Sequence, residues 1–270
     1  MPEVKVKERV LKVLKGTGAI AEGTADVAKD ATVTVLKDAG EIGAGVANVS
    51  KDVVAAALGA VEEVGTGLIR TVKGVVVGIV KGVGEVTTVT AGVLSDTVRA
   101  AIKGTGDIGG DLTATVGGIA SGVITTSKDV GVGLAEGAYA MGKAAIGATS
   151  EIGGDVTSAA ASLMSGAVSG ASEVGDSAMT AVRNTAKGLI AGAGDVGADI
   201  TEVTRSAITG AISGAKDVGL SAEDAASATV SGAMEAAEKM GESAVHAVRD
   251  VAASGIGGVK AVIKGEQETA

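Results

Sequence analysis

Apolar residues recur along this chain with a period of 22 residues. One column of the repeat is apolar at all twelve of its positions, from Ile20 to Val262, and a second column sixteen residues further on is apolar from Leu36 to Ile256. No insertion or deletion interrupts the spacing. A fixed period of this length is typical of repeat proteins, in which every unit adds the same structural element. We divide the chain into a lead-in at 1–18, eleven repeats at 19–260, and a partial repeat with a polar tail at 261–270.

The period predicts helix, because 22 residues make six turns at about 3.67 residues per turn. On a helical wheel the apolar columns occupy an arc of about 230°, and the charged columns occupy the remaining arc of about 130°. We therefore predict an all-α fold in which one long amphipathic helix of eleven Gly/Ala-rich repeats packs laterally against further copies in a homo-oligomer.

Two other folds fit the repeat. If Gly-rich segments such as 192–197 are turns, with Asp199 or Ser221 capping the next helix, the chain is an up-and-down stack of short antiparallel helices. A β-solenoid is the second alternative, since its coils can have a length close to this period. The Val, Thr and Gly of residues 72–93 favour that fold, whereas the strong helix formers of residues 221–251 do not.

The polar arc is sorted by charge. The residue before the first apolar column is acidic in nine consecutive units: Glu41, Glu63, Glu85, Asp107, Asp129, Glu151, Glu173, Asp195 and Asp217. The opposite edge carries Lys29, Lys51, Lys73, Arg183, Arg205 and Arg249. Only a few of these charges can pair within one helix. We expect parallel copies to lie side by side, acidic edge against basic edge, in a ring or a filament; otherwise the charges simply solvate a surface.

Glycine makes up 44 of the 270 residues. Within a helix each Gly costs about 0.8–1 kcal/mol relative to Ala, so an isolated helix of this composition is not expected to persist in water. Many of the glycines are spaced by four, which allows two helix backbones to approach closely. The positions we expect to pack in this way are Gly166, Gly170, Gly188, Gly192, Gly210 and Gly214.

The remaining composition limits the possible functions. The chain has no Cys, so disulfides and thiolate metal sites are excluded. Its net charge of −9 disfavours nucleic acid as a partner. The single histidine, His246, occupies a column otherwise held by acidic residues, and the acidic column recurs about every 33 Å along a helix. We therefore expect no catalytic, cofactor or metal site, and no enzyme.

The lead-in differs from the repeats in carrying a cluster of basic residues. As a short amphipathic helix it could dock on an anionic membrane or could cap the end of the array. The residues expected to contact a membrane are Lys5, Lys7, Arg9, Lys12 and Lys15. No signal peptide or apolar segment of membrane-spanning length is visible, so we expect a cytoplasmic protein that associates with membranes at most peripherally.

The uninterrupted rhythm and the Val/Ala/Thr/Gly apolar face, as in residues 43–53, resemble the 11-residue amphipathic repeats of synucleins, perilipins and apolipoproteins. The synuclein signature Lys-Thr-Lys-Glu-Gly-Val and the prolines of apolipoprotein repeats are absent. The resemblance implies a chain that becomes helical on lipid or in an assembly. We expect a structural protein that assembles with itself and turns its apolar face to lipid or to a second protein layer. The alternative is a soluble coiled-coil or helical-hairpin scaffold that binds a protein partner.

Overall fold

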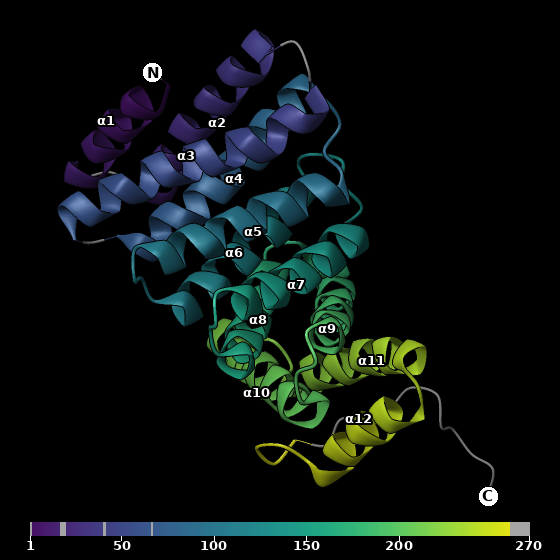
Figure 1. Cartoon of the computed structure of the whole chain (residues 1–270). Helices are drawn as coiled ribbons and strands as arrows, with labels where there is room; N and C mark the ends of the chain where they lie inside the picture. The colour runs from purple at the N-terminus through teal and green to yellow at the C-terminus, as the bar shows by residue number, and fades with distance from the viewer. Residues whose placement is uncertain (1, 17–19, 40–41, 66, 260–270) are drawn as a thin grey trace, which may run out of the picture.

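The protein is all-α. The structure is a computed structural model that describes residues 2–16, 20–39, 42–65 and 67–259. These residues form twelve α-helices and one short 3-10 helix, η1, and their only β character is an isolated bridge between Ile256 and Val259. In chain order (Figure 1) the elements are α1 (Pro2–Lys15), α2 (Ile20–Ala39), α3 (Ile42–Val64), α4 (Leu68–Val86), α5 (Ala91–Asp107), α6 (Leu112–Ser127), α7 (Leu134–Glu151), α8 (Val156–Ala171), η1 (Gly175–Ser177), α9 (Ala178–Asp195), α10 (Ile200–Val218), α11 (Ala222–Met240) and α12 (Glu242–Ser254).

Two of the folds considered from the sequence are wrong for the described residues. No β-solenoid is present in the described chain, because the second apolar column lies on helices from Leu36 to Met234 and no strand is formed. A single continuous helix is also wrong, since the helices are 13–23 residues long and end once in each unit. From α6 to α11 the helices begin at intervals of one repeat, at Leu112, Leu134, Val156, Ala178, Ile200 and Ala222.

The glycine that follows the first apolar column ends the helix in most units. At Gly153 and Gly197 the backbone has φ of 70°, the left-handed conformation that stops a helix. The next backbone N–H then reaches back to the last turn, from Ala198 to the carbonyl of Ala193 at 2.9 Å, which is the Schellman arrangement. From α6 to α10 each helix and the turn after it together span 22 residues, so the 11-residue rhythm passes unbroken through the turns and resembles that of a continuous helix.

A polar residue two positions after that glycine begins the next helix. The carboxylate of Asp155 accepts hydrogen bonds from the backbone N–H groups of Thr157 at 2.9 Å and Ser158 at 3.1 Å. Such N-caps satisfy amide groups that the first helical turn leaves without a partner. Asp199 and Ser221 cap α10 and α11 in the same way, so the caps expected for a chain of short helices are confirmed.

The helices form two layers. With the exception of α12, each helix packs most extensively against the helix two positions along the chain. Short connections reverse the chain between successive helices, so odd-numbered helices gather in one layer and even-numbered helices in the other (Figure 1). The helices α1 and α12 lie at opposite ends of this array.

The apolar columns are buried inside the chain's own array. The second column is at most 5% exposed from Leu36 to Ile212, and Ile102, Ile124 and Ile146 in it are fully buried. Residues of the first column, such as Ile108, Ile152 and Val196, are half-buried and pack against the same core. In the described structure, neighbouring repeats therefore cover the wide apolar arc of each helix.

The helix α12 departs from the pattern, and the sequence gives a physical reason. Gly210 and Gly232 occupy positions where a β-carbon would overlap with the backbone of the helix two earlier. The next member of that column is Ser254, whose side chain cannot be accommodated at such a contact. α12 packs mainly on α11 instead, and Val251 covers a small cluster with Ile208, Ile212 and Val230.

Candidate functional site

Glycines bring neighbouring helices of one layer into backbone contact. A β-carbon on Gly166 would overlap with the carbonyl oxygen of Gly117, and Gly210 has the same relation to Ala161. Gly188 lies against Tyr139 in this way. One turn later, a β-carbon on Gly170 or Gly214 would lie 2.8 Å, and on Gly192 3.0 Å, from a carbonyl oxygen of the facing helix. All six glycines expected to pack closely thus lie at contacts between helices of the same chain.

The contacts also fix the direction of the helices. From the pair Gly166–Gly117 to the pair Gly170–Ser121 both residue numbers rise by four, so α8 and α6 run parallel. The same offset in sequence relates Gly210 in α10 to Ala161 in α8. Parallel helices at this separation have their charged edges side by side, which is the geometry that the sequence pattern predicted for separate copies.

Ion pairs cross these parallel contacts with a constant sense. The cation belongs to one helix and the carboxylate to the helix two further on, or to the turn just after that helix. Glu151 pairs with both Arg99 and Lys103. The other pairs that involve the predicted acidic edge are Glu63 with Lys7 at 3.5 Å, Glu85 with Lys29 at 2.9 Å, Asp129 with Lys81 at 3.3 Å and Asp195 with Lys143 at 2.8 Å.

The remaining predicted edge residues are placed differently. Glu41 lies outside the described residues. Five of them take part in no ion pair within the described part of the chain: Asp107, Glu173, Asp217, Lys51 and Arg205. Arg249 is exposed on α12. Lys73 donates a hydrogen bond to the hydroxyl of Ser121 at 3.0 Å. Arg183 pairs with Glu235, which also binds Lys187 at 2.8 Å.

Glu235 and Lys103 were not among the predicted edge residues, although the spacing contains a signal for both. Each ion pair between helices of one layer joins residues 48, 52 or 56 positions apart. These separations equal two repeats plus about one, two or three helical turns. A search for opposite charges at those separations would have found Arg183 with Glu235.

The ion pairs shift the pKa values of their members. Hydrogen bonds from Lys103 and then the charge of Arg99 lower the pKa of the Glu151 carboxyl. Burial alone would raise the pKa of Glu235, but hydrogen bonds from Lys187 and Arg183 outweigh it and lower that pKa. The pKa values of Lys29 and Lys143 are raised, chiefly by hydrogen bonds to Glu85 and Asp195. Each shift favours the charged form that the pairing requires.

The basic lead-in helix uses its apolar side within the fold. Val6 and Val10 of α1 are buried, and α1 packs chiefly on α3. Lys7 pairs with Glu63, and Arg9 pairs with Asp30 of α2 at 2.9 Å. The other three residues expected to contact a membrane, Lys5, Lys12 and Lys15, are exposed.

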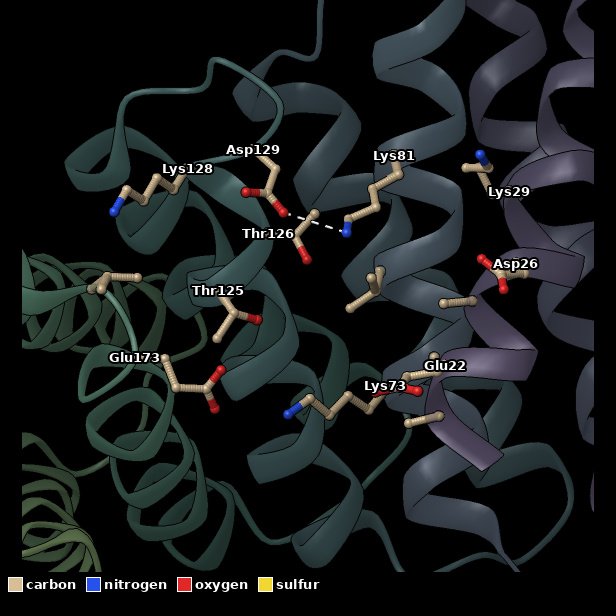
Figure 2. Close-up of a pocket in the computed structure, with 15 residues that line it drawn as sticks. Glu22, Asp26, Lys29, Lys73, Lys81, Thr125, Thr126, Lys128, Asp129 and Glu173 are labelled. Atoms are coloured by element: carbon tan, nitrogen blue, oxygen red, sulfur yellow. Dashed lines mark ion pairs between the residues drawn. The ribbon is translucent and has the colours of Figure 1, made fainter. Parts of the chain in front are cut away.

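A groove of about 630 Å³ crosses the face of the even-numbered layer over α2, α4 and α6 (Figure 2). Its floor includes Ala21, Ala25, Gly74 and Val77. Eight charged residues surround it, with both signs represented: Glu22, Asp26, Asp129 and Glu173, and Lys29, Lys73, Lys81 and Lys128. The pair Lys81–Asp129 crosses it, and Lys29 is held by Glu85.

Several of these groove residues have no charged partner within the described structure. No ion pair there involves Lys73, Lys128, Glu22, Asp26 or Glu173. Figure 2 shows Glu173 on one side of the groove and Glu22 and Asp26 on the opposite side, with Lys73 between them. The groove is therefore a charged concave surface at which side chains of both signs converge, and five of its eight charged residues form no ion pair in the described structure.

Neither a metal centre nor a membrane span stands out in the described chain. Its His, Asp and Glu residues form no group of three that could hold a metal ion. Its helices are too short or too polar to cross a bilayer. The sequence matches no known protein-family model and no curated protein.

Proposed function

We propose that this chain is a non-enzymatic helical scaffold that binds an extended segment of a protein partner in the groove over α2, α4 and α6. The observation that carries the proposal is the convergence, in one groove, of charges of both signs that form no ion pair within the described residues. The apolar columns are covered by neighbouring repeats, and five residues of the acidic edge pair within the chain. The groove gathers five charged residues that form no ion pair in the described structure, namely Lys73, Lys128, Glu22, Asp26 and Glu173.

The chemistry of the groove defines the kind of segment that fits it. Lys73 and Lys128 can donate to carboxylates of the partner, and Glu22, Asp26 and Glu173 can accept from its Lys or Arg side chains. The floor of Ala, Gly and Val accommodates small side chains or bare backbone. The partner segment is therefore extended, of mixed charge and poor in bulky residues. Such a surface supplies specificity and association rate more than raw affinity.

A displayed peptide library of mixed-charge segments, panned on the immobilised full chain, tests this proposal. We expect selected peptides to bind in a salt-dependent manner and to lose at least about tenfold in affinity when Lys73 and Lys128 are both changed to Glu, a change of about 1.4 kcal/mol. Lys239→Glu on the exposed surface of α11 is the matched control, since it lies outside the groove. Peptides that bind the double variant as well as the parent chain would refute the proposed site.

Self-assembly and membrane docking are competing functions that the same preparation can test. Light scattering of the purified chain between micromolar and millimolar concentration measures whether copies associate through their edges. Sedimentation with anionic vesicles measures docking through Lys5, Lys12 and Lys15, exposed cations of α1 that form no ion pair in the described structure. A monomer that does not bind vesicles and selects peptides supports the scaffold. A concentration-dependent assembly, or vesicle binding lost in a Lys5/Lys12/Lys15→Glu variant, would favour the competing functions.

A further inference from the structure

The connection between α4 and α5 differs from the turns after α5, α7, α9 and α10. In nine units a Gly follows the first apolar column, but here that position is Thr87. α4 ends at Val86, and Thr87 is extended, with φ of −155° and ψ of −178°. Thr90, which caps α5, is also extended, with φ of −115° and ψ of 166°. The turns after α5, α7 and α9 close with a 6→1 hydrogen bond, whereas here the backbone N–H of Thr87 donates to the carbonyl of Val83 at 2.8 Å and a non-helical linker follows.

The packing register changes at the same step. Before it, Gly74 and Gly78 of α4 lie against the carbonyl groups of Ala21 and Ala25. After it, Gly166 lies against Gly117, so the offset in sequence between facing residues is shorter by about one helical turn. The ion pairs shift in parallel, from separations of 56 residues in the first four helices to 52 or 48 afterwards.

The helices are also farther apart at this step. A β-carbon on Gly122 of α6 would lie 3.5 Å from the carbonyl oxygen of Lys73 in α4. At Gly78 and Gly166, the equivalent positions on either side, it would overlap with the carbonyl oxygens of Ala25 and Gly117. The contact between α4 and α6 is less extensive than those of α2 with α4 and of α6 with α8. The contact of α3 with α5 is less extensive than those of α1 with α3 and of α5 with α7.

Grooves open on both faces of the array where the helices separate. The charged groove over α2, α4 and α6 lies on one face. On the other face a second groove of about 460 Å³ lies between α3 and α5, lined by Val54, Ala100 and Gly104 with Lys51, Asp96 and Asp107 among its charged residues. The step is loosely packed on both faces and joined by a non-helical linker. Of the polar contacts that cross it, those of Lys81 with Asp129 and of Lys73 with Ser121 involve long lysine side chains that can follow a change of angle.

We infer that this step is a joint, and that α1–α4 and α5–α12 swing against each other as two blocks. Each block keeps its own register of close backbone contacts, which resist bending because close-packed interiors deform little. The Thr87–Thr90 linker takes up the change in backbone angles, as hinge segments do. Bending that narrows one groove widens the other, so the joint couples the two faces. It does not depend on a partner being bound.

Two site-specific labels can measure motion at the joint, and because the chain has no cysteine, an introduced cysteine pair can form only one disulfide. Spin labels on encoded azido residues at Glu62 and Ser213 span the joint, while labels at Thr113 and Ser213 both lie in the second block; all three positions are exposed. By double electron–electron resonance we expect the distance distribution that spans the joint to be roughly twice as wide as that within the block. Distributions of equal width would overturn the inference.

A reversible crosslink across the joint compares one pair of label positions with itself, so differences between label positions cannot account for the result. A β-carbon on Gly118 would lie 4.0 Å from that of Lys73, within the range that a disulfide bridges. In a Lys73→Cys/Gly118→Cys chain carrying the same labels at Glu62 and Ser213, oxidation is expected to narrow the distribution and reduction to restore it. A width that stays unchanged on verified disulfide formation would show that the step is already rigid.

Discussion

Gly166 of α8 lies against the backbone carbonyl of Gly117 in α6 so closely that no side chain fits between them. This contact explains why a mostly helical protein retains 44 glycines, most of them unfavourable in isolated helices. The glycines allow parallel helices to pack backbone to backbone, and the contact area gained compensates for the helix propensity lost. The repeat thus uses in a layered helical array the small-residue spacing best known from helices in lipid.

Enlarging one of these glycines should destabilise the fold. In a Gly210→Ala variant the new methyl group overlaps with the carbonyl oxygen of Ala161. We expect the free energy of unfolding to fall by about 1–3 kcal/mol, the usual cost of overpacking, despite a gain of about 1 kcal/mol in helix propensity. Urea unfolding followed by circular dichroism measures the change.

The matched control is Gly147→Ala in α7. There the nearest atoms to a new β-carbon are the guanidinium nitrogens of Arg99 at 3.8 Å and 3.9 Å, an ordinary contact distance. This variant should be more stable than the parent by up to about 1 kcal/mol, since only the propensity term acts. Equal effects at Gly210 and Gly147 would mean that the interhelical contact contributes nothing.

The turn glycines should respond to a different property, namely backbone conformation. A β-carbon at Gly153 would meet no atom within 4 Å, but the residue has φ of 70°. Gly153→Ala is therefore expected to cost about 1–2 kcal/mol through the left-handed conformation alone. Gly153→Asn should recover part of that loss, because Asn tolerates this conformation better. Thermal unfolding of the two variants separates the two causes. If backbone strain dominates, the Asn variant is more stable than the Ala variant; if steric overlap dominates, the larger Asn side chain makes it less stable.

The sequence predicts much of the local structure and little of the connectivity. The 22-residue period, the all-α class and the caps at Asp199 and Ser221 follow from residue spacing. The prediction of one continuous helix is wrong because Gly153 and its equivalents end most of the helices without changing the 22-residue spacing of the apolar columns. The phase of the repeat indicates which side of a helix a residue occupies, and it is preserved wherever a helix and its following turn together span 22 residues.

The spacing of the charges also does not determine which helix faces each charged edge. Sorting charges on a wheel predicts that an acidic edge faces a basic edge, but not whether the facing helix belongs to another copy or to the same chain. That depends on the chain reversing at each glycine turn, which brings Glu151 beside Arg99 and Lys103. The charged groove was likewise not predictable, since it arises where the register between parallel helices changes.

Buried hydroxyl groups without partners identify sites where the protein can be stabilised. The hydroxyl oxygens of Thr204 and four other buried threonines make no hydrogen bond in the described structure. Burying such a group without a partner costs about 1–3 kcal/mol. Thr204→Val keeps the shape and removes the polar atom, so we expect a gain of about 1 kcal/mol. Thr229→Val is the control, because the hydroxyl of Thr229 donates to the carbonyl of Ala225 at 2.7 Å. A larger gain at Thr229 in denaturant titrations would contradict this assignment.

Acid should weaken the fold through the paired carboxylates. The pKa of Glu235 lies below its ordinary value of 4.5 in the folded chain, so folding favours its ionised form. The stabilisation from Lys187 and Arg183 is then complete above the unfolded pKa and is lost as pH falls through the lower folded value. Since the pair is partly exposed, its contribution is at most about 1 kcal/mol.

Glu235→Gln tests that contribution. The variant should be less stable than the parent at pH 7 and should lose less stability than the parent between pH 6 and pH 3, because one titrating group that favours the folded state has been removed. The control is Glu238→Gln on the same helix, which is exposed and has no ion pair within the described residues; it should follow the parent curve. Urea titrations across that pH range give the comparison. If the Glu235→Gln and parent curves stay parallel, the two cations do not stabilise the carboxylate, and the charge sorting of the repeat only solvates the surface.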